Sequence, residues 1–529
     1  TMMSLKRSQF KNMRNFEMEK NKPNLLFIKS DQHNFRYMSH RGNTEVETPN
    51  LDELASRGAT FTNVYCHSPI CVPSRVAFLT GLMPSETEVW TNDQILNSAT
   101  PTYAHALGAG GYRPVQIGRM HLNGLDQYHG FSERYVGDHN RNFLGSPRDP
   151  GTHQEHMRGT AGPNRISLIQ SGAGRSAYEI HDRIVTDRTV EYINQFCSNS
   201  NNESHSFALS VGYMLPHQPY VCQKEIYQQF RDKVKLPEIK EKKLEDYHPY
   251  LQWWKENTGS TDITDEENLR CKAAYSGLVF SLDCMIGEII KCLKKNEIFN
   301  ETIIVYTSDH GDQVGEHGFW WKQTFYEDSV KVPTIISYPK MLRSNIEMNE
   351  VINHFDITAT MLDLTNSPTL PRSQGKSLKN MLISDSNSWE NVAISEYCMD
   401  DSNFANVSGN LGGRDVHAKP GGVQNKMIRR EEWKLIFYEG YKPQIFNLKE
   451  DPQELHDRVD DPKTKEIKAT LINEVLTNWN PTEIHQRMID LKKDQLMQQE
   501  WAKNTDPDDK LRWNLDPLND SSRLDQANI

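Results

Sequence analysis

Four short apolar runs recur along the chain, separated by longer segments in which apolar and polar residues are mixed. The runs cover residues 24–28, 112–117, 207–211 and 302–307. Short, nearly continuous apolar runs separated by helical stretches predict buried parallel strands. A further segment, 354–364, has the amphipathic pattern of a helix. The pattern therefore predicts an α/β fold with a mostly parallel sheet flanked by helices.

Each of the four runs leads into a short cluster of polar residues suited to metal or anion chemistry. The clusters begin at Asp31, Gly118, Pro216 and Ser308. In open α/β sheets the ligand site lies outside the carboxyl ends of the strands. We therefore expect the four clusters to meet at one edge of the sheet.

A fifth feature is the pentapeptide that runs from Cys71 to Arg75. It lies between a β-branched run over 60–65 and a segment over 76–81 that reads as a helical turn. Cys71 is thus expected at a helix N-terminus, where free N–H groups and the helix dipole favour a bound oxyanion. Two other interpretations stay open, a small buried cysteine in a turn and a disulfide between Cys66 and Cys71.

The pattern changes after about residue 371. From there on, short predicted strands follow one another, without the helical segments that separate the earlier strands. These strands are expected over 392–397, 426–429, 433–438 and 444–447, with a helix near 464–476. We predict a polar, flexible extension over 1–21, an α/β catalytic domain over 22–375 and a small antiparallel-sheet subdomain over 376–480. A charged C-terminal tail over 481–529 completes the chain.

Composition narrows the class of protein without defining the chemistry. The 529 residues are 36% hydrophobic, which is ordinary for a globular enzyme, and no run has transmembrane length. The formal charge of −11 argues against general attraction to nucleic acid, so local Lys and Arg must hold any anionic substrate. The N-terminus lacks the apolar core of a signal peptide, so we expect a cytoplasmic chain, or a periplasmic or secreted one if a signal has been removed.

Taken in order, the motifs resemble those of the type I, formylglycine-dependent sulfatases of the alkaline-phosphatase superfamily. The resemblance extends from about Pro23 to about Arg458. It implies an alkaline-phosphatase-like α/β domain with a smaller C-terminal α+β subdomain. The matching segments are 23–28 with Asp31, 48–55, 71–75, 118–121, 216–219, 307–312, 315–318 and 326–333.

The resemblance implies one divalent metal held by Asp31, Gln32, Asp309 and His310, with Cys71 as a further ligand. Carboxylate and amide oxygens suit Ca²⁺, Mg²⁺ or Mn²⁺, and Ca²⁺ is our expectation. Many sulfatases carry a second Asp at the position of Gln32 and an Asn at that of His310. The variants found here resemble choline sulfatases and phosphonate monoester hydrolases.

The resemblance also implies that a formylglycine-generating enzyme converts Cys71 into an aldehyde whose hydrate is the nucleophile. Arg75 would orient this hydrate and offset its charge. His121 would be the base for its second hydroxyl, and His217 would protonate the departing oxygen. The sulfate oxygens would be clamped by Lys322 and Arg119, although the family usually has Lys where this chain has Arg119.

Three functions follow as hypotheses. The first is removal of sulfate from a sulfated carbohydrate, favoured by the polar segment 138–142 and by Trp320 and Trp321 beside Lys322. The second is a choline sulfatase or a phosphonate or phosphate ester hydrolase, and the third is a silent binding protein in which Cys71 stays a thiol. His317 and the Trp pair either shape the pocket or pack internally. The tail resembles tails that join subunits in choline-sulfatase-like enzymes, so a homo-oligomer is expected.

Overall fold

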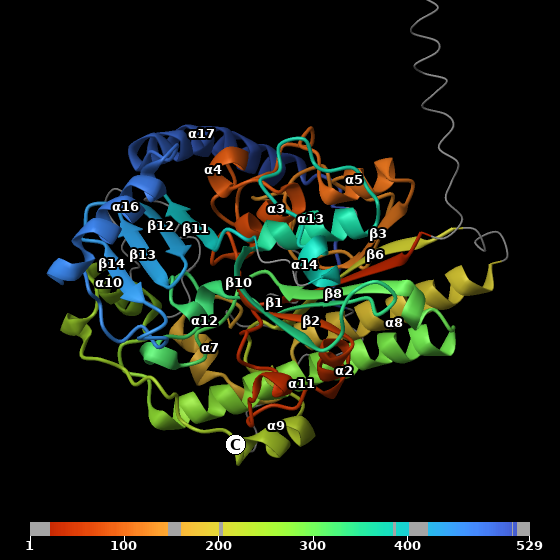
Figure 1. Ribbon diagram of the computed structural model, residues 1–529, viewed down its shortest axis with the longest axis horizontal. Coiled ribbons are helices and arrows are strands. Elements are labelled where there is room, and N and C mark those ends of the chain that lie inside the picture. Colours follow the sequence, from red (N-terminus) through yellow and green to blue (C-terminus); the bar gives the residue numbers. More distant parts are fainter. Residues whose placement is uncertain are drawn as a thin grey trace, which may run out of the picture.

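A computed structural model describes residues 22–145, 160–199, 205–384, 388–400, 422–509 and 511–515. The predicted extension over 1–21 and the last part of the predicted tail, 516–529, lie outside this range. Most of the described chain folds around one large sheet, and a second, smaller sheet follows it (Figure 1). The predicted domain boundaries at 21/22, 375/376 and 480/481 stay predictions.

The large sheet has eight strands in the order β10-β2-β9-β8-β1-β6-β3-β4. Its pairings are parallel except for those of β9, which runs antiparallel to both β2 and β8. The strands are β1 (Asn24–Asp31), β2 (Gly58–Tyr65), β3 (Arg113–Gly118), β4 (Glu133–Tyr135), β6 (Phe207–Pro216), β8 (Thr302–Ser308), β9 (Thr334–Ser337) and β10 (Ile346–Asn353).

The four strands predicted from apolar runs are the neighbours β8, β1, β6 and β3 at the centre of the sheet. Their side chains point alternately to the two faces, as the geometry of a strand requires. In β1, Leu25 and Phe27 enter one hydrophobic core, and Leu26 and Ile28 enter the other. Both faces are thus buried, which explains why these strands are apolar throughout.

Helices cover both faces of the sheet, and this confirms the predicted α/β architecture (Figure 1). One face is covered by α3 (Cys71–Thr80), α5 (Tyr103–Ala109) and α13 (His354–Leu364). The other is covered by α2 (Pro49–Ser56), α8 (Ala177–Ser198) and α11 (Asp265–Lys295). The predicted helix over 354–364 has the bounds of α13.

The long helix α11 is fixed at its start by a reciprocal capping box. The Thr264 hydroxyl accepts a hydrogen bond from the Glu267 amide, and the Glu267 carboxylate accepts one from the Thr264 amide. This satisfies two N–H groups that the first turn of a helix leaves free. Lys294 and Lys295 in the last turn complement the negative end of the helix dipole.

The smaller sheet is an antiparallel meander of four strands that confirms the expected C-terminal α+β subdomain. Ile428, Leu435 and Ile445 on one face pack against Leu471 and Val475 of the following helix. Its elements are β11 (Val392–Met399), β12 (Val423–Arg430), β13 (Trp433–Tyr438), β14 (Gln444–Asn447) and α16 (Lys465–Leu476).

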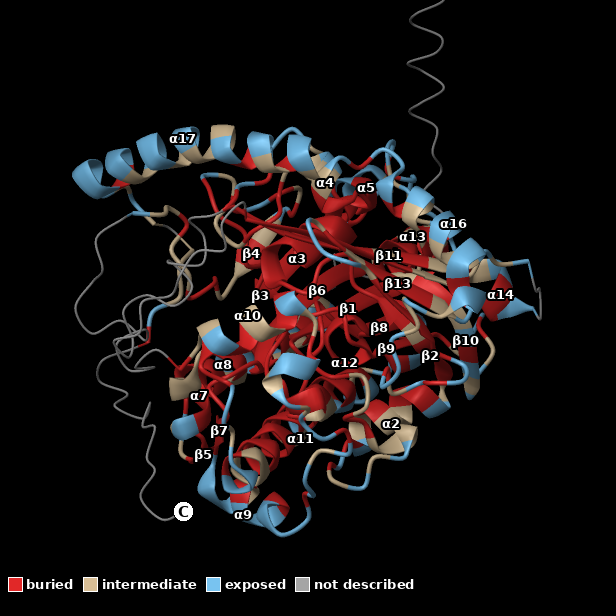
Figure 2. Ribbon diagram, turned by 90° about the vertical axis from the view of Figure 1, so that its left-hand side faces the viewer, coloured by how far each residue is buried: buried red, intermediate tan, exposed pale blue. Residues whose placement is uncertain are grey.

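The last helix, α17 (Pro481–Thr505), begins in the predicted tail and lies along the edge of the molecule with its outer side exposed (Figure 2). It packs on its own chain, since Met488 joins Trp90 in a small core and Gln495 Nε2 donates to the Asp93 carbonyl at 3.3 Å. Near its end, Trp501 contacts Phe143. Contacts of the tail with a second copy stay a prediction.

Shorter elements complete the described chain. They are α4 (Pro84–Thr87), α7 (Arg165–Ile169), β5 (Gly172–Ala173), β7 (Val221–Cys222), α9 (Lys224–Arg231), α10 (Pro249–Thr258), α12 (Glu327–Val330) and α14 (Lys379–Ile383). Single 3₁₀ turns occur at Ser39–Arg41, Leu244–Asp246, Phe299–Glu301, Glu316–Gly318 and Pro462–Thr464. Among the described helices, none combines the length and the apolar character needed to cross a membrane.

Gly118 ends β3 in a position that no other residue fits without strain. Its φ is +80°, and a Cβ built on it would lie 2.3 Å from the carbonyl oxygen of Gly212. We expect Gly118→Ala to lower the free energy of unfolding by roughly 2–4 kcal/mol, because it combines an unfavourable φ with a backbone clash. Thermal unfolding measures this, with Gly108→Ala as the control.

Gly108 lies in α5, and a Cβ there would meet nothing within 4 Å. Alanine should therefore leave stability unchanged or raise it slightly at this position. If Gly118→Ala unfolds at the same temperature as the parent protein, the backbones of β3 and β6 do not approach each other as closely at Gly118 and Gly212 as the structure shows.

Candidate active site

Residues from two of the predicted clusters meet the Cys71 pentapeptide beyond the carboxyl ends of β1 and β8. Asp31 ends β1, Asp309 and His310 follow β8, and Cys71 is the first residue of α3. One ligand atom from each of the four lies within 4.8 Å of the others, and all four side chains are buried. The structure thus brings together four of the five residues predicted to hold a metal.

Arg75 joins the two carboxylates of this cluster. Its Nη2 donates to Asp31 Oδ2 and its Nε to Asp309 Oδ2, both at 2.9 Å. Nη1 is buried and has no hydrogen-bond partner among the described residues, so it remains available to an anionic group. Burial opposes ionisation of Asp31, but the charges of Arg119 and Arg75 outweigh it and hold the pKa of Asp31 well below its usual value.

His310 presents a lone pair to the cluster. Its Nδ1 lies 2.9 Å from the Gly311 carbonyl and donates to it, so Nε2 is the unprotonated nitrogen. Nε2 lies 3.2 Å from Cys71 Sγ and 3.6 Å from Asp309 Oδ1. Burial lowers the pKa of His310 to about 4, which keeps the imidazole neutral. Two carboxylates and one neutral imidazole fit a divalent cation.

Gln32 is held so that its amide oxygen faces Lys322. Its Nε2 donates to Gln218 Oε1 and to Asp312 Oδ2, each at 2.6 Å, and its Oε1 accepts from Lys322 Nζ at 2.8 Å. No role for Gln218 or Asp312 follows from the sequence, although they lie within the motifs 216–219 and 307–312. The place of Gln32 among the metal ligands stays a prediction.

Lys322 connects the cysteine with the second predicted histidine. Its Nζ donates to Cys71 Sγ at 3.1 Å and to His217 Nε2 at 3.0 Å. His217 Nδ1 donates to the Gln218 carbonyl at 2.7 Å, so its Nε2 carries the lone pair. Burial and the nearby Lys322 charge lower the pKa of His217. Lys322 and His217 therefore form a donor–acceptor pair beside Cys71.

Arg119 makes three hydrogen bonds within the site. Its Nε donates to Asp31 Oδ2 at 2.6 Å, its Nη2 to His121 Nδ1 at 2.8 Å and its Nη1 to His139 Nδ1 at 3.2 Å. A lysine could not make these bonds at once, because they need the planar fork of a guanidinium. Arg119 therefore positions its neighbours, and its predicted contact with sulfate must use its remaining N–H groups.

His121 has the opposite tautomer from His217 and His310. Its Nδ1 accepts from Arg119, so the neutral ring carries its proton on Nε2. Burial and the charges of Arg119 and Arg75 lower its pKa well below the usual value. The predicted role of His121 as a base stays a prediction, and it requires this ring to exchange tautomers.

Asp138 supports the site from outside. It belongs to the polar segment 138–142 that favours the carbohydrate hypothesis, but its carboxylate is buried and accepts from the backbone amides of Met120 and His121. These bonds hold His121 at a φ of +59°, a conformation that is uncommon for residues other than glycine. His139, Asn140 and Arg141 line the cavity, and contact of this segment with a sugar stays a prediction.

The site opens into a cavity of about 560 Å³. Trp320 and Trp321 do not reach it, because both are fully buried and donate their indole N–H groups to Asn268 and Ser167. His317 stacks on Tyr326 at 3.9 Å and also packs internally. The residues that line the cavity include Cys71, Arg119, His121, Asn140, Arg141, Tyr178, His217, Gln218, Lys322 and Gln323.

Cys66 and Cys71 are separate thiols in the structure. Burial raises the pKa of Cys66, whose surroundings are those of an inert core cysteine. Cys71 alone of the two lines the cavity. The alternative of a disulfide at the head of α3 is not what the structure contains.

Solved structures with a similar fold include a hydrolase and a sulfatase. A phosphonate monoester hydrolase from Agrobacterium radiobacter has a TM-score of 0.68 and 22% identity, over 86% of this chain and 95% of that one. BT1596, a 2-O GAG sulfatase, has a TM-score of 0.65 and 21% identity, over 87% of this chain and 93% of that one. The fold is therefore that of the alkaline-phosphatase-like sulfatases and phosphonate hydrolases.

The family follows from the sequence comparisons. The Sulfatase family model matches residues 23–367. The choline-sulfatase of Rhizobium meliloti (strain 1021) is 31% identical over 86% of each chain, and arylsulfatase K of Bos taurus is 27% identical over 96% of this chain and 91% of its own. The chain belongs to the sulfatase family and is a sulfuric ester hydrolase.

Proposed function

We propose that this enzyme removes sulfate from a sulfated carbohydrate by means of a formylglycine formed from Cys71. The observation that carries the proposal is the position of Cys71 Sγ. It lies 3.1 Å from Lys322 Nζ and 3.2 Å from His310 Nε2, at the wall of a cavity that also holds Arg119 and Arg141. In the mature enzyme, an oxygen of the hydrated aldehyde would take the place of this sulfur.

Maturation replaces the Cys71 thiol by an aldehyde on the same carbon. The carbon is oxidised by two electrons, gains an oxygen and releases its sulfur as sulfide. A separate formylglycine-generating enzyme catalyses this oxidation with an external two-electron acceptor such as molecular oxygen. Water then adds to the aldehyde and gives two hydroxyls on one carbon. A divalent cation held by Asp31, Asp309 and His310, for which Ca²⁺ is our proposal, would act as a Lewis acid on this group.

In the first chemical step, one hydroxyl attacks sulfur and the bond between sulfur and the alcohol oxygen breaks. The attacking hydroxyl gives up a proton and the departing oxygen gains one. Lys322 and His217 are our candidates to carry this proton, since Lys322 contacts Cys71 and His217, and both line the cavity.

In the second step, the remaining hydroxyl gives its proton to a base, for which His121 is the candidate. The bond between carbon and the sulfate oxygen breaks, sulfate leaves and the aldehyde re-forms. The base later releases its proton to solvent, and a water molecule restores the hydrate. A serine in place of the hydrate would stop at a stable sulfate ester, because it has no second hydroxyl.

The lining of the cavity favours a carbohydrate as the alcohol. Amide side chains that can bond sugar hydroxyls come from Asn92, Asn123, Asn140, Gln218 and Gln323. Arg119, Arg141 and Lys322 make the wall cationic, which suits sulfate and disfavours a quaternary ammonium. Asp93 is the carboxylate that the described lining offers to such a cation.

Choline sulfate is the second candidate, because a choline-sulfatase is 31% identical to this chain. A comparison of kcat/KM on sulfated monosaccharides, choline sulfate and a phosphonate monoester distinguishes the candidates. We expect the saccharide to be preferred by at least tenfold. A preference for choline sulfate or for the phosphonate would refute the carbohydrate assignment and leave the family intact.

The maturation of Cys71 can be tested directly. Protein made in a host with the maturation enzyme should show, by peptide mass spectrometry, an aldehyde at Cys71, and Cys71→Ser should fold and bind substrate without turnover. Cys66→Ser is the matched control, because Cys66 is buried nearby and lies outside the cavity. Full activity with an unmodified Cys71 thiol would contradict the mechanism.

A further inference from the structure

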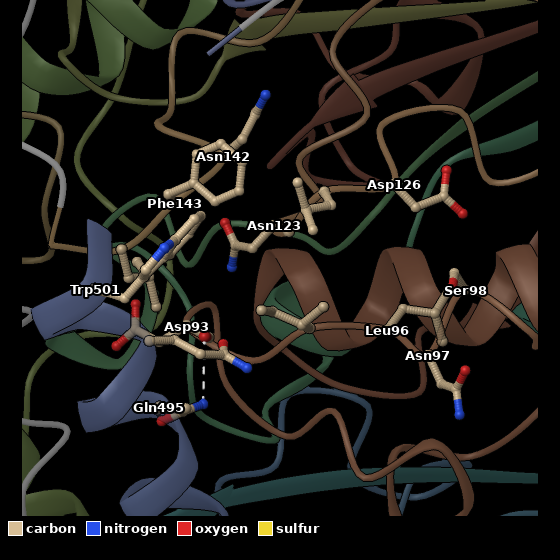
Figure 3. A pocket seen from close by; sticks show the side chains of 15 residues that line it. Asp93, Leu96, Asn97, Ser98, Asn123, Asp126, Asn142, Phe143, Gln495 and Trp501 are labelled. Carbon is tan, nitrogen blue, oxygen red and sulfur yellow. Dashed lines mark hydrogen bonds between the residues drawn. The ribbon is translucent and has the colours of Figure 1, made fainter. Parts of the chain in front are cut away.

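A second cavity opens beside the catalytic one and has a different character. Its volume is about 510 Å³, within the range of small-molecule sites. Asp93, Asn123, Phe143 and Leu144 line both cavities, so the two are neighbours. One wall of the second cavity is the helix α17, which contributes Gln495, Gln498 and Trp501 (Figure 3).

The second cavity offers an aromatic surface to a ligand. Trp501 and Phe143 lie with ring centroids 5.6 Å apart in an edge-to-face arrangement. Trp501 is 44% exposed although it is anchored near the end of a long helix. An exposed indole that is fixed in place provides a flat, apolar face of the kind on which the C–H face of a sugar ring packs.

The remaining wall is rich in neutral hydrogen-bonding groups. Asn97, Ser98, Asn123, Asn142 and Gln498 all line this cavity (Figure 3). Amide and hydroxyl groups can both donate and accept, which matches the hydroxyls of a sugar. A cavity of this size also exceeds the needs of a trimethylammonium group, which argues for a larger ligand.

Charge separates the two cavities. The catalytic cavity is lined by Arg119, Arg141 and Lys322, whereas the only charged side chains among the described lining of the second cavity are Asp93 and Asp126. Lys492 acts on Asp93 from α17 but does not line the cavity. A sulfate or carboxylate in the second cavity would therefore face two carboxylates and no cation from the described lining.

We infer that the second cavity is a binding subsite for an uncharged sugar unit that is linked to the sulfated unit in the catalytic cavity. The inference rests on the proposed function and adds to it the chemistry of the neighbouring sugar. Trp501 and Phe143 form the stacking surface, and the amides bind hydroxyls. The substrate is then a saccharide in which the unit next to the sulfated one carries no charge.

Three substrates that share one sulfated sugar test this inference. The first is its methyl glycoside, the second has a neutral hexose in place of the methyl group, and the third has a hexuronic acid there. We expect the neutral hexose to lower KM about tenfold relative to the methyl glycoside, which is the effect of one good stacking contact. The hexuronic acid should give no such gain.

Two variants locate the effect. Trp501→Ala should abolish the gain from the neutral hexose and leave the methyl glycoside unchanged. Gln498→Lys should improve the hexuronic acid substrate several-fold, because it places a cation in the lining. Met497→Lys is the matched control for charge, since Met497 is its neighbour in α17, is 74% exposed and does not line the cavity.

The outcomes separate this inference from the proposed function. If the neutral hexose gives no gain, or if Trp501→Ala weakens the methyl glycoside equally, the subsite is refuted while desulfation of the methyl glycoside still supports the function. An equal improvement by Met497→Lys and Gln498→Lys would also refute it. If the enzyme desulfates none of the three saccharides, both proposals are overturned.

Discussion

Asp309→Asn should lose its bound metal and nearly all of its activity together. The substitution removes one of the two carboxylates from the cluster. It keeps a side-chain oxygen that can accept from the backbone N–H of Gln32, whose nitrogen lies 3.0 Å from Asp309 Oδ1. Lewis-acid stabilisation is typically worth several kcal/mol, so we expect kcat to fall roughly 10³-fold or more. Elemental analysis after dialysis and steady-state kinetics measure the two effects separately.

The control for this change is Asp363→Asn, because Asp363 is on the surface and pairs with Lys379. That variant should keep its metal and its activity. Stoichiometric metal and full activity in Asp309→Asn would place the metal elsewhere. Loss of activity with the metal retained would show instead that Asp309 acts through Arg75.

His217→Ala should discriminate between substrates by their leaving groups. Sugar alkoxides leave poorly without a proton, so kcat/KM on a sugar sulfate should fall by about 10²–10⁴. An activated aryl sulfate needs little help, and its rate should fall less than about tenfold. Equal losses on the two substrates would refute the role of His217 in proton delivery.

His121→Ala should behave differently, because it is proposed to act after the alcohol has left. The sulfated enzyme should accumulate with either substrate, and intact mass spectrometry should detect it. His456→Ala serves as a control for both histidines, since His456 is exposed and does not line the catalytic cavity. If no sulfated enzyme is trapped, His121 is not the base, in keeping with the tautomer that Arg119 imposes on it.

The sequence was sufficient to predict the centre of the fold. The strands formed by residues 24–28 and 302–307 are buried on both faces of the sheet. A strand in this position is apolar throughout, so the continuous apolar runs are enough to predict central strands. Asp31 and Asp309 follow these strands immediately, and a parallel sheet brings such strand ends to one edge. The place of Asp31 and Asp309 in the sequence, directly after a strand, is therefore enough to predict their place in the fold.

Other parts of the site depend on contacts that no local pattern encodes. Asp138 and Asn140 are near neighbours of similar polarity, yet one supports the backbone of His121 and the other lines the cavity. Arg119 was expected to hold sulfate, but its neighbours in space show that it also holds Asp31 and His121. Trp321 lies beside Lys322 in sequence and points into the core.

The position of α17 has a consequence for how this enzyme can diversify. The groups that we propose to break bonds lie between residues 31 and 322, whereas part of the wall of the neighbouring cavity comes from a helix that starts at Pro481. Mutations in that helix change the lining of the second cavity, which we propose holds a neighbouring sugar, and leave Cys71 and its contacts unchanged. Selection can therefore retune substrate preference in the last helix while the reaction chemistry is inherited intact.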